Sequence, residues 1–296
     1  IILFKQNIET ADQVRKLCLK CQSFAASCGL PPLIIATDQE GGSVARFRDG
    51  FTRFGGGPDI TTPGDAQRFA EVTARELLAV GVNMNFAPVM DVVPNGVDSI
   101  MASRAIPGAP ETVADLGCKV IEQLQAQGMM SVAKHFPGIG RTVLDSHFHL
   151  PALDADPETL QATDLVPFKQ AVHVGVTGIM LSHIMYTQLD NTWQASLSTA
   201  IADRLLRQKM GYDGLVMTDD LDMKAIGHDI ETCIGQILKA RIDLALICHK
   251  GPNVERAVVE LRRQLTQIPE LRNDAVLSYR RVLKTKERFL NSGRMS

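Results

Sequence analysis

Residues 178–219 read Gly178-Ile-Met-Leu-Ser-His183, then a helical segment at Thr199–Lys209, then Gly214-Leu-Val-Met-Thr-Asp219. Both flanking runs are apolar almost to their last residue, which is typical of strands that are buried on both faces of a sheet. A helix between two such strands predicts a parallel pair covered by helices. This unit decides the fold class, which is α/β.

The same alternation of short strands and amphipathic helices runs along the chain. Further strands are predicted at Ile1–Phe4, Leu33–Thr37, Met84–Pro88, Ser131–His135 and Leu244–Cys248. Further helices are predicted at Ala11–Ala26, Asp65–Val80, Pro110–Gln127, Pro157–Val174, Glu231–Ala240, Asn253–Gln264 and Asp274–Leu290. Seven strands in 296 residues without a linker predict one domain, residues 1–296, that forms a closed (β/α)8 TIM-type barrel. We expect its N-terminal strand and helix to be missing from the chain.

Composition excludes several other classes of protein. The formal net charge is −2 with both signs interspersed, which argues against a nucleic-acid or membrane-surface partner. No apolar run approaches the roughly 18 residues of a membrane span. No phosphate loop of the form G-x-G-x-x-G opens a helix, which disfavours a doubly wound nucleotide-binding sheet. The six cysteines lie mostly in helix-like or strand-like segments, so we expect free thiols and a reducing compartment, the cytoplasm.

Five of the seven predicted strands end in a carboxylate or an imidazole. These residues are Asp38, His135, His183, Asp219 and His249. Each strand could simply stop where polarity begins, but the repeated choice of Asp or His favours a site. In a closed barrel, the carboxyl ends of the strands form the catalytic face.

The end of the run at residues 214–220 carries two carboxylates, Asp219 and Asp220. Side chains alternate along a strand, so one carboxylate can face a pocket while the other caps the next turn. A pocket carboxylate opposite a proton carrier suits glycoside hydrolysis, in which one group attacks the anomeric carbon and another protonates the leaving oxygen.

The loop-like segment Lys134–Pro151 offers that proton carrier. Asp145 and His147 lie two residues apart within it. An imidazole titrates near pH 6.5, and a neighbouring carboxylate would fix its tautomer and raise its basicity. The sequence therefore predicts an Asp145–His147 dyad that works together with Asp219.

Three alternatives remain open from the residues alone. His147-Phe148-His149 with Lys134, His135, His183 and Asp219 could form a zinc or binuclear site of a metal-dependent barrel hydrolase. An imidazole acid/base repels phosphate less than a carboxylate does, so phosphorolysis could replace hydrolysis, and a β-glucosidase could use the same scaffold. A carbohydrate-binding protein without catalysis is the third possibility, although it would need neither dyad nor nucleophile.

Four ordered motifs resemble glycoside hydrolase family 3. They are Asp38-Gln-Glu-Gly-Gly42, Lys134-His-Phe-Pro-Gly138, Asp145-Ser-His147 and Thr218-Asp-Asp-Leu221. Within the family they resemble bacterial exo-β-N-acetylglucosaminidases of cell-wall recycling, and the likeness extends from Ile1 to about His249. Departures include Ile139, where the family usually has His, and Arg241, where Gly is usual.

The resemblance implies a retaining double displacement on N-acetylglucosamine-containing muropeptides by a monomeric enzyme that needs no cofactor or metal. Asp219 matches the nucleophile, His147 the acid/base and Asp145 its orienting partner. The positions that match substrate-binding residues are Asp38, Arg46, Arg104, Lys134, His135, His183 and Met185.

Overall fold

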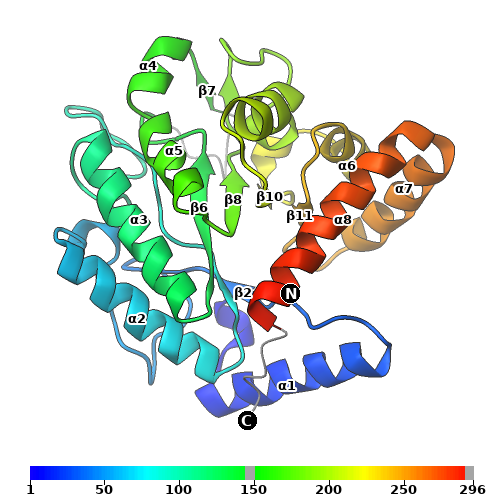
Figure 1. Ribbon diagram of the computed structural model, residues 1–296, viewed down its shortest axis with the longest axis horizontal. Coiled ribbons are helices and arrows are strands. Elements are labelled where there is room, and N and C mark those ends of the chain that lie inside the picture. The colour runs from blue at the N-terminus through cyan, green and yellow to red at the C-terminus, as the bar shows by residue number, and fades with distance from the viewer. Residues whose placement is uncertain (144–150, 291–296) are drawn as a thin grey trace.

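The computed structural model describes residues 1–143 and 151–290. At its centre lies a seven-stranded sheet in the order β1-β2-β5-β6-β8-β10-β11, in which neighbouring strands run parallel (Figure 1). These strands are β1 (Ile2–Leu3), β2 (Ala36–Thr37), β5 (Met84–Asn85), β6 (Met130–Phe136), β8 (Gly178–Leu181), β10 (Leu215–Asp220) and β11 (Leu244–Leu246). All seven predicted strands are present, although several are only two or three residues long.

The prediction of a closed (β/α)8 barrel was wrong. In the described part of the chain the sheet is curled but open, and β1 and β11 are its two edges. Paired strands lie about 4.8 Å apart, whereas a cavity of about 300 Å³ lies between these two edges, lined by apolar side chains that include Ile2 and Leu244. Val282 and Phe289 pack against the same apolar cluster. The two edge strands, β1 and β11, are therefore not paired with each other by backbone hydrogen bonds.

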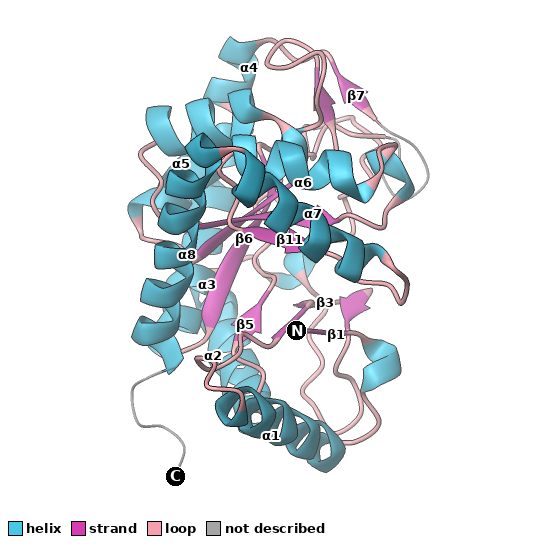
Figure 2. Ribbon diagram, turned by 90° about the vertical axis from the view of Figure 1, so that its right-hand side faces the viewer, coloured by secondary structure: helices cyan, strands magenta, loops and turns pink. Residues whose placement is uncertain are grey.

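Helices lie around the outside of the curled sheet (Figure 2). They are α1 (Ala11–Ser27), α2 (Pro63–Ala79), α3 (Pro110–Ala126), α4 (Pro157–Ala162), α5 (Leu165–His173), α6 (Ile230–Lys239), α7 (Asn253–Gln267) and α8 (Pro269–Leu290). Side-chain caps begin several of them: Thr10 accepts from the backbone of Gln13, and Thr62 forms a capping box with Asp65. No helix in the described ranges is long and apolar enough to span a membrane.

Three local features differ from the sequence-based expectation. The helix expected at Pro157–Val174 is split into α4 and α5, because Thr163 leaves helical geometry and Asp164 turns inward to bind Arg141. Residues Ala200–Lys209 form a π-helix, η4. Short strand pairs β3 (Gln39–Gly41) with β4 (Val44–Ala45) and β7 (Ala152–Leu153) with β9 (Met185–Tyr186) were not expected.

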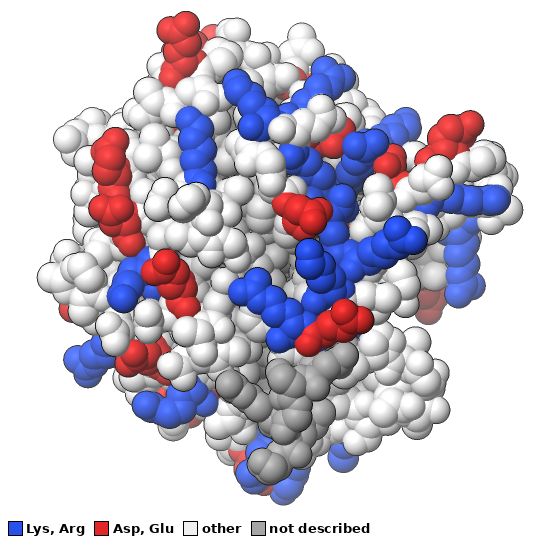
Figure 3. All heavy atoms as spheres, in the orientation of Figure 1, with Lys and Arg blue, Asp and Glu red and all other residues white. Residues whose placement is uncertain are grey.

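The inner face of the sheet is apolar in its middle and charged at one end. Met84, Val132, Met180 and Met217 belong to one buried cluster on this face. Charged side chains follow at the carboxyl ends of the strands, as parallel packing dictates. On the outer surface, Lys and Arg gather over the part of the face where α8 lies, with acidic side chains between them (Figure 3).

Candidate active site

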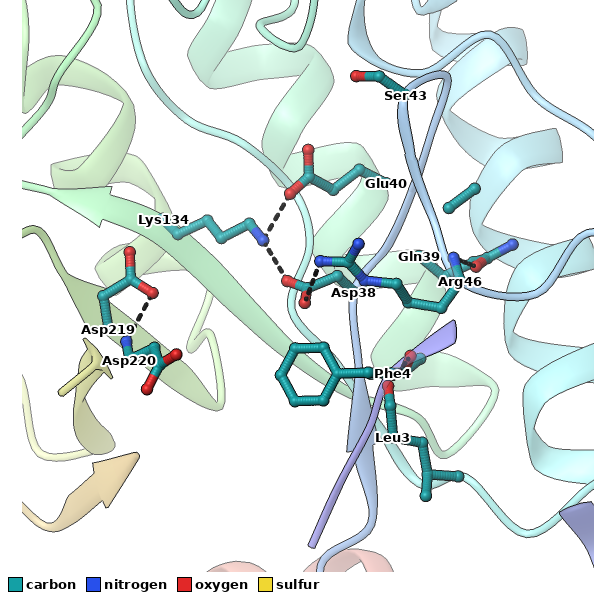
Figure 4. A network of polar contacts seen from close by, with 12 residues as sticks. Leu3, Phe4, Asp38, Gln39, Glu40, Ser43, Arg46, Lys134, Asp219 and Asp220 are labelled. Carbon is teal, nitrogen blue, oxygen red and sulfur yellow. Dashed lines mark hydrogen bonds and ion pairs between the residues drawn. The ribbon is translucent and has the colours of Figure 1, made fainter. Parts of the chain in front are cut away.

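A buried lysine holds two carboxylates together at the carboxyl end of the sheet. Lys134 comes from β6 and its side chain is 2% exposed. Its ammonium lies 2.8 Å from Asp38 Oδ1 and 2.6 Å from Glu40 Oε1, as Figure 4 shows. Burial alone would lower the pKa of Lys134, but the two carboxylates outweigh this effect and raise it. The lysine is therefore a fixed cation.

Two arginines complete this charged cluster. Arg104 binds Glu40 through two hydrogen bonds, of 2.7 Å and 3.0 Å. Arg46 lies 3.3 Å from Asp38 Oδ2, and the ring of Phe4 covers its guanidinium at 5.6 Å. Burial would raise the pKa of Asp38, but the neighbouring cations hold it below its ordinary value. Arg46 Nε is buried and has no hydrogen-bond partner among the described residues.

A residue that the sequence analysis missed, Asp91, positions His135. Asp91 Oδ2 lies 2.8 Å from His135 Nδ1, and Asp91 Oδ1 accepts the backbone N–H of Ile139 at 2.8 Å. Arg104 Nη2 lies 3.4 Å from His135 Nε2. Because a guanidinium can only donate, Nε2 accepts, and Nδ1 carries the proton that it donates to Asp91. The only signal in the sequence was an acidic residue just after the strand at Met84.

Asp219 and Asp220 have different surroundings at the end of β10. Asp219 lines the cavity, and its Oδ1 accepts the backbone N–H of Asp220 at 2.8 Å. Burial would raise the pKa of Asp219, but the combined effect of His183, His135, the backbone N–H of Asp220 and the Lys134 ammonium lowers it. Asp219 is therefore ionised at neutral pH. Asp220 also lines the cavity, but its carboxylate accepts the backbone N–H groups of Asp222 and Cys248 and so caps a turn.

One cavity of about 680 Å³ joins most of the residues that the sequence singled out. Its lining includes Asp38, Arg46, Arg104, Lys134, His135 and Asp219. His183 and Met185 are not in the described lining: His183 is 1% exposed beneath it, and Met185 lies in β9. Asp145 and His147 fall in 144–150, outside the described residues. Ile139 lines the cavity and also belongs to the main apolar core.

One group in the described ranges has the spacing of metal ligands. Oxygens of Asp220 and Asp222 and a nitrogen of His249 lie within 4.8 Å of one another. Both carboxylates already accept backbone N–H groups, since Asp222 Oδ2 binds the amides of Cys248 and His249. These contacts explain the cluster as a link between the segments at the carboxyl ends of β10 and β11.

The described histidines of the zinc alternative have protein partners. His135 Nδ1 binds Asp91, and His183 uses both ring nitrogens, on Ser196 and on the Asp220 carbonyl. Neither ring presents an unoccupied nitrogen in the arrangement that a zinc site needs.

Comparison with known proteins gives a family and a set of relatives. A model of the "Glycosyl hydrolase family 3 N terminal domain" matches residues 1–284. The chain is 33% identical to a beta-hexosaminidase of Methylobacillus flagellatus, over 88% of this chain and 76% of that protein. It is 31% identical to a beta-hexosaminidase of Nitrosomonas eutropha, over 99% of this chain and 87% of that protein.

Solved structures agree with these relatives. A glycoside hydrolase family 3 beta-N-acetylglucosaminidase from Paenibacillus sp. str. FPU-7 superposes with a TM-score of 0.94 and 33% identity, over 100% of this chain but only 58% of that one. A beta-N-acetylhexosaminidase from Beutenbergia cavernae superposes with a TM-score of 0.88 and 27% identity, over 94% of this chain and 86% of that one.

Proposed function

Because the chain belongs to glycosyl hydrolase family 3, and is thus a glycoside hydrolase, we propose that it removes terminal β-linked N-acetylglucosamine by a retaining double displacement. The family assignment rests on a match to residues 1–284 of the 296-residue chain. The two relatives described above, of which the chain covers 76% and 87%, are named beta-hexosaminidases. The observation that carries the mechanism is the ionised Asp219 carboxylate at the end of β10, facing the cavity.

In the first step Asp219 attacks the anomeric carbon of the bound sugar. The bond from that carbon to the leaving oxygen breaks, and a covalent glycosyl ester forms on Asp219. Water then attacks the same carbon, and the carboxylate leaves. The lowered pKa of Asp219 supports this role, because a nucleophile must be ionised at working pH.

The leaving oxygen must gain a proton in the first step, and the attacking water must lose one in the second. We assign its transfer to His147, oriented by Asp145, on the strength of the sequence motif and the family resemblance. His147 protonates the leaving oxygen in the first step and takes a proton from the attacking water in the second. An imidazole suits both roles because its ordinary pKa lies close to neutrality.

The charged cluster binds the sugar in this proposal. Asp38, Arg46, Arg104, Lys134 and His135 line one side of the cavity and are fixed by their mutual contacts. Charge-assisted hydrogen bonds to hydroxyls are strong, and prefixed partners lose little freedom on binding.

The finer proposal concerns the natural substrate. Following the resemblance to cell-wall recycling enzymes, we propose that the sugar is removed from muropeptide fragments by a monomer in the cytoplasm. Chromatography of muropeptide digests before and after incubation with the enzyme tests the substrate, since free N-acetylglucosamine must appear.

The roles are tested with Asp219→Ala on an aryl N-acetyl-β-glucosaminide. We expect kcat to fall about 10⁴-fold, because removal of one member of a catalytic set has this effect in other enzymes. Added azide should restore turnover by attacking the vacant face, giving an α-glycosyl azide. Asp213→Ala is the matched control, because that carboxylate is 76% exposed. An Asp219→Ala variant within tenfold of the unmodified enzyme would reject the assignment.

A further inference from the structure

His183 is clamped at both ring nitrogens inside the protein. Nδ1 lies 2.7 Å from Ser196 Oγ, and Nε2 lies 2.8 Å from the backbone carbonyl oxygen of Asp220. The carbonyl can only accept, so Nε2 carries the ring proton. Nδ1 is then an acceptor, and the Ser196 hydroxyl must donate to it. The hydrogen bonds therefore run in one direction, from Ser196 through His183 to Asp220.

Ser196 is itself held firmly. It is fully buried in the short helix η3 (Ala195–Leu197), and its backbone N–H donates to the carbonyl of Ser182 at 3.0 Å. The N–H of Ala195 donates to the carbonyl of Ile184 at 2.9 Å. The chain on both sides of His183 is thus tied to η3, which leaves the Ser196 hydroxyl little freedom to point elsewhere.

The hydrogen bonds that start at Ser196 and pass through His183 continue to Asp219 through the backbone of Asp220. Asp220 donates its backbone N–H to Asp219 Oδ1 at 2.8 Å and gives its carbonyl to His183. The next residue, Leu221, donates its N–H to the carbonyl of Leu246 at 2.8 Å. The backbone that follows Asp219 is fixed on both sides, so the orientation of the Asp219 carboxylate depends on the position of His183.

His183 is also kept neutral. The charged or titratable groups that face it are Asp219, Asp220 and His135, and the two carboxylates favour the protonated ring. Burial outweighs them and lowers the pKa of His183. In the neutral ring Nδ1 offers a lone pair that accepts the Ser196 hydroxyl, whereas in a doubly protonated ring Nδ1 would donate to the Ser196 oxygen and the direction of this hydrogen bond would reverse.

We propose that Ser196 locks His183 as the Nε2–H tautomer and that His183, through the Asp220 carbonyl, positions Asp219 for attack. Both are positioning residues, and neither needs to touch the sugar. Both ring nitrogens of His183 are engaged, so the ring has no nitrogen left for a sugar hydroxyl. The positioning role therefore replaces the role in substrate binding that the resemblance implies for His183. The catalytic part of this inference rests on the proposed function.

The tautomer is tested first, on the unmodified enzyme labelled with ¹⁵N-histidine. Long-range ¹H–¹⁵N correlation at pH 7, with His183 assigned through the backbone, should show a neutral ring protonated at Nε2. A ring protonated at Nδ1, or at both nitrogens, overturns the proposal. This measurement needs no variant, so a failure of any variant to fold does not affect it.

The positioning role is tested with Ser196→Ala against Ser198→Ala. Ser198 is equally buried two residues further on, but its hydroxyl donates to Asp190 Oδ2 at 2.6 Å, away from His183. On an aryl N-acetyl-β-glucosaminide, Ser196→Ala should lower kcat about tenfold, equivalent to ~1.4 kcal/mol of barrier. KM should stay within about twofold, and the His183 signals should change. Ser198→Ala should leave kcat unchanged.

Two results reject the positioning role. The first is a Ser196→Ala enzyme that keeps both kcat and the His183 tautomer, and the second is an equal loss of kcat in the two variants. Lack of hydrolysis by the unmodified enzyme would instead overturn the proposed function, while the tautomer measurement would still decide whether the Ser196–His183–Asp220 series exists.

Discussion

Replacing Lys134 with methionine should destabilise the enzyme through the two carboxylates that the lysine holds. Met keeps most of the side-chain length but removes the ammonium that lies 2.8 Å from Asp38 and 2.6 Å from Glu40. Breaking a buried ion pair by removing one partner costs about 3–5 kcal/mol. Arg46 and Arg104 still contact the carboxylates, so we expect the lower end, about 3 kcal/mol. For a chain of this size the midpoint of thermal unfolding should fall by roughly 5 °C.

The size of this effect should depend on pH in a defined way. The pKa values of Asp38 and Glu40 are lowered in the folded protein, so their contribution is present above the unfolded values near 4 and is lost as the pH falls through the folded values. The pKa of Lys134 is raised, so its contribution is present below the unfolded value of about 10.4 and is lost as the pH rises through the folded value. The difference between the two proteins should therefore be constant between about pH 5 and pH 9 and shrink below about pH 4.

Urea unfolding followed by circular dichroism at several pH values measures this difference directly. Lys169→Met is the matched control, because Lys169 is exposed and its ammonium contacts only a backbone carbonyl among the described residues. It should change the free energy of unfolding by less than about 0.5 kcal/mol. A Lys134→Met protein within about 1 kcal/mol of the unmodified enzyme at pH 7 would refute the reasoning, since the cluster would then not depend on its central cation.

Three further outcomes follow from the site and its support. The pKa of Asp219 is lowered, so its carboxylate should stay ionised as the pH falls. Labelling of Asp219 by an activated glycosyl fluoride should therefore proceed at a constant rate from pH 5 to pH 7. A labelling rate that falls with an apparent pKa above 5 would contradict this. Asp91→Asn removes the charge that orients His135 and should lower kcat/KM about tenfold in steady-state assays, which unchanged kinetics would disprove. Asp243→Asn leaves the 7%-exposed Arg207 without its ion pair and should cost about 3 kcal/mol in urea unfolding, whereas a loss below about 1 kcal/mol would show the pair to be dispensable.

The strands and their polar ends could be predicted because both are local properties of the sequence. Continuous apolar runs marked the seven strands, and the alternation of side chains predicted different surroundings for Asp219 and Asp220. The edges of the sheet could not be predicted in the same way. Whether β1 pairs with β11 depends on the approach of segments more than 200 residues apart, and periodicity carries no information about it.

Asp91 and Ser196 could not be predicted for the same reason, because their contacts join segments that are distant in the sequence. Asp91 contacts His135 across 44 positions, and no motif connects the two. Ser196 belongs to a stretch of sequence rich in small polar residues, where nothing distinguishes its hydroxyl from that of Ser198 until β8 and η3 are brought together. Side chains that support a site from outside its motifs become visible only when the hydrogen bonds of each buried polar group are followed to their ends.

The most direct test of Asp219 as the nucleophile is to trap the covalent intermediate. The enzyme is incubated with a 5-fluoro N-acetylglucosaminyl fluoride, digested with a protease and mapped by mass spectrometry. We expect one added sugar per chain, carried by the peptide that contains Asp219, and loss of labelling in Asp219→Ala. A label on another carboxylate, or full inactivation without a covalent label, would contradict it.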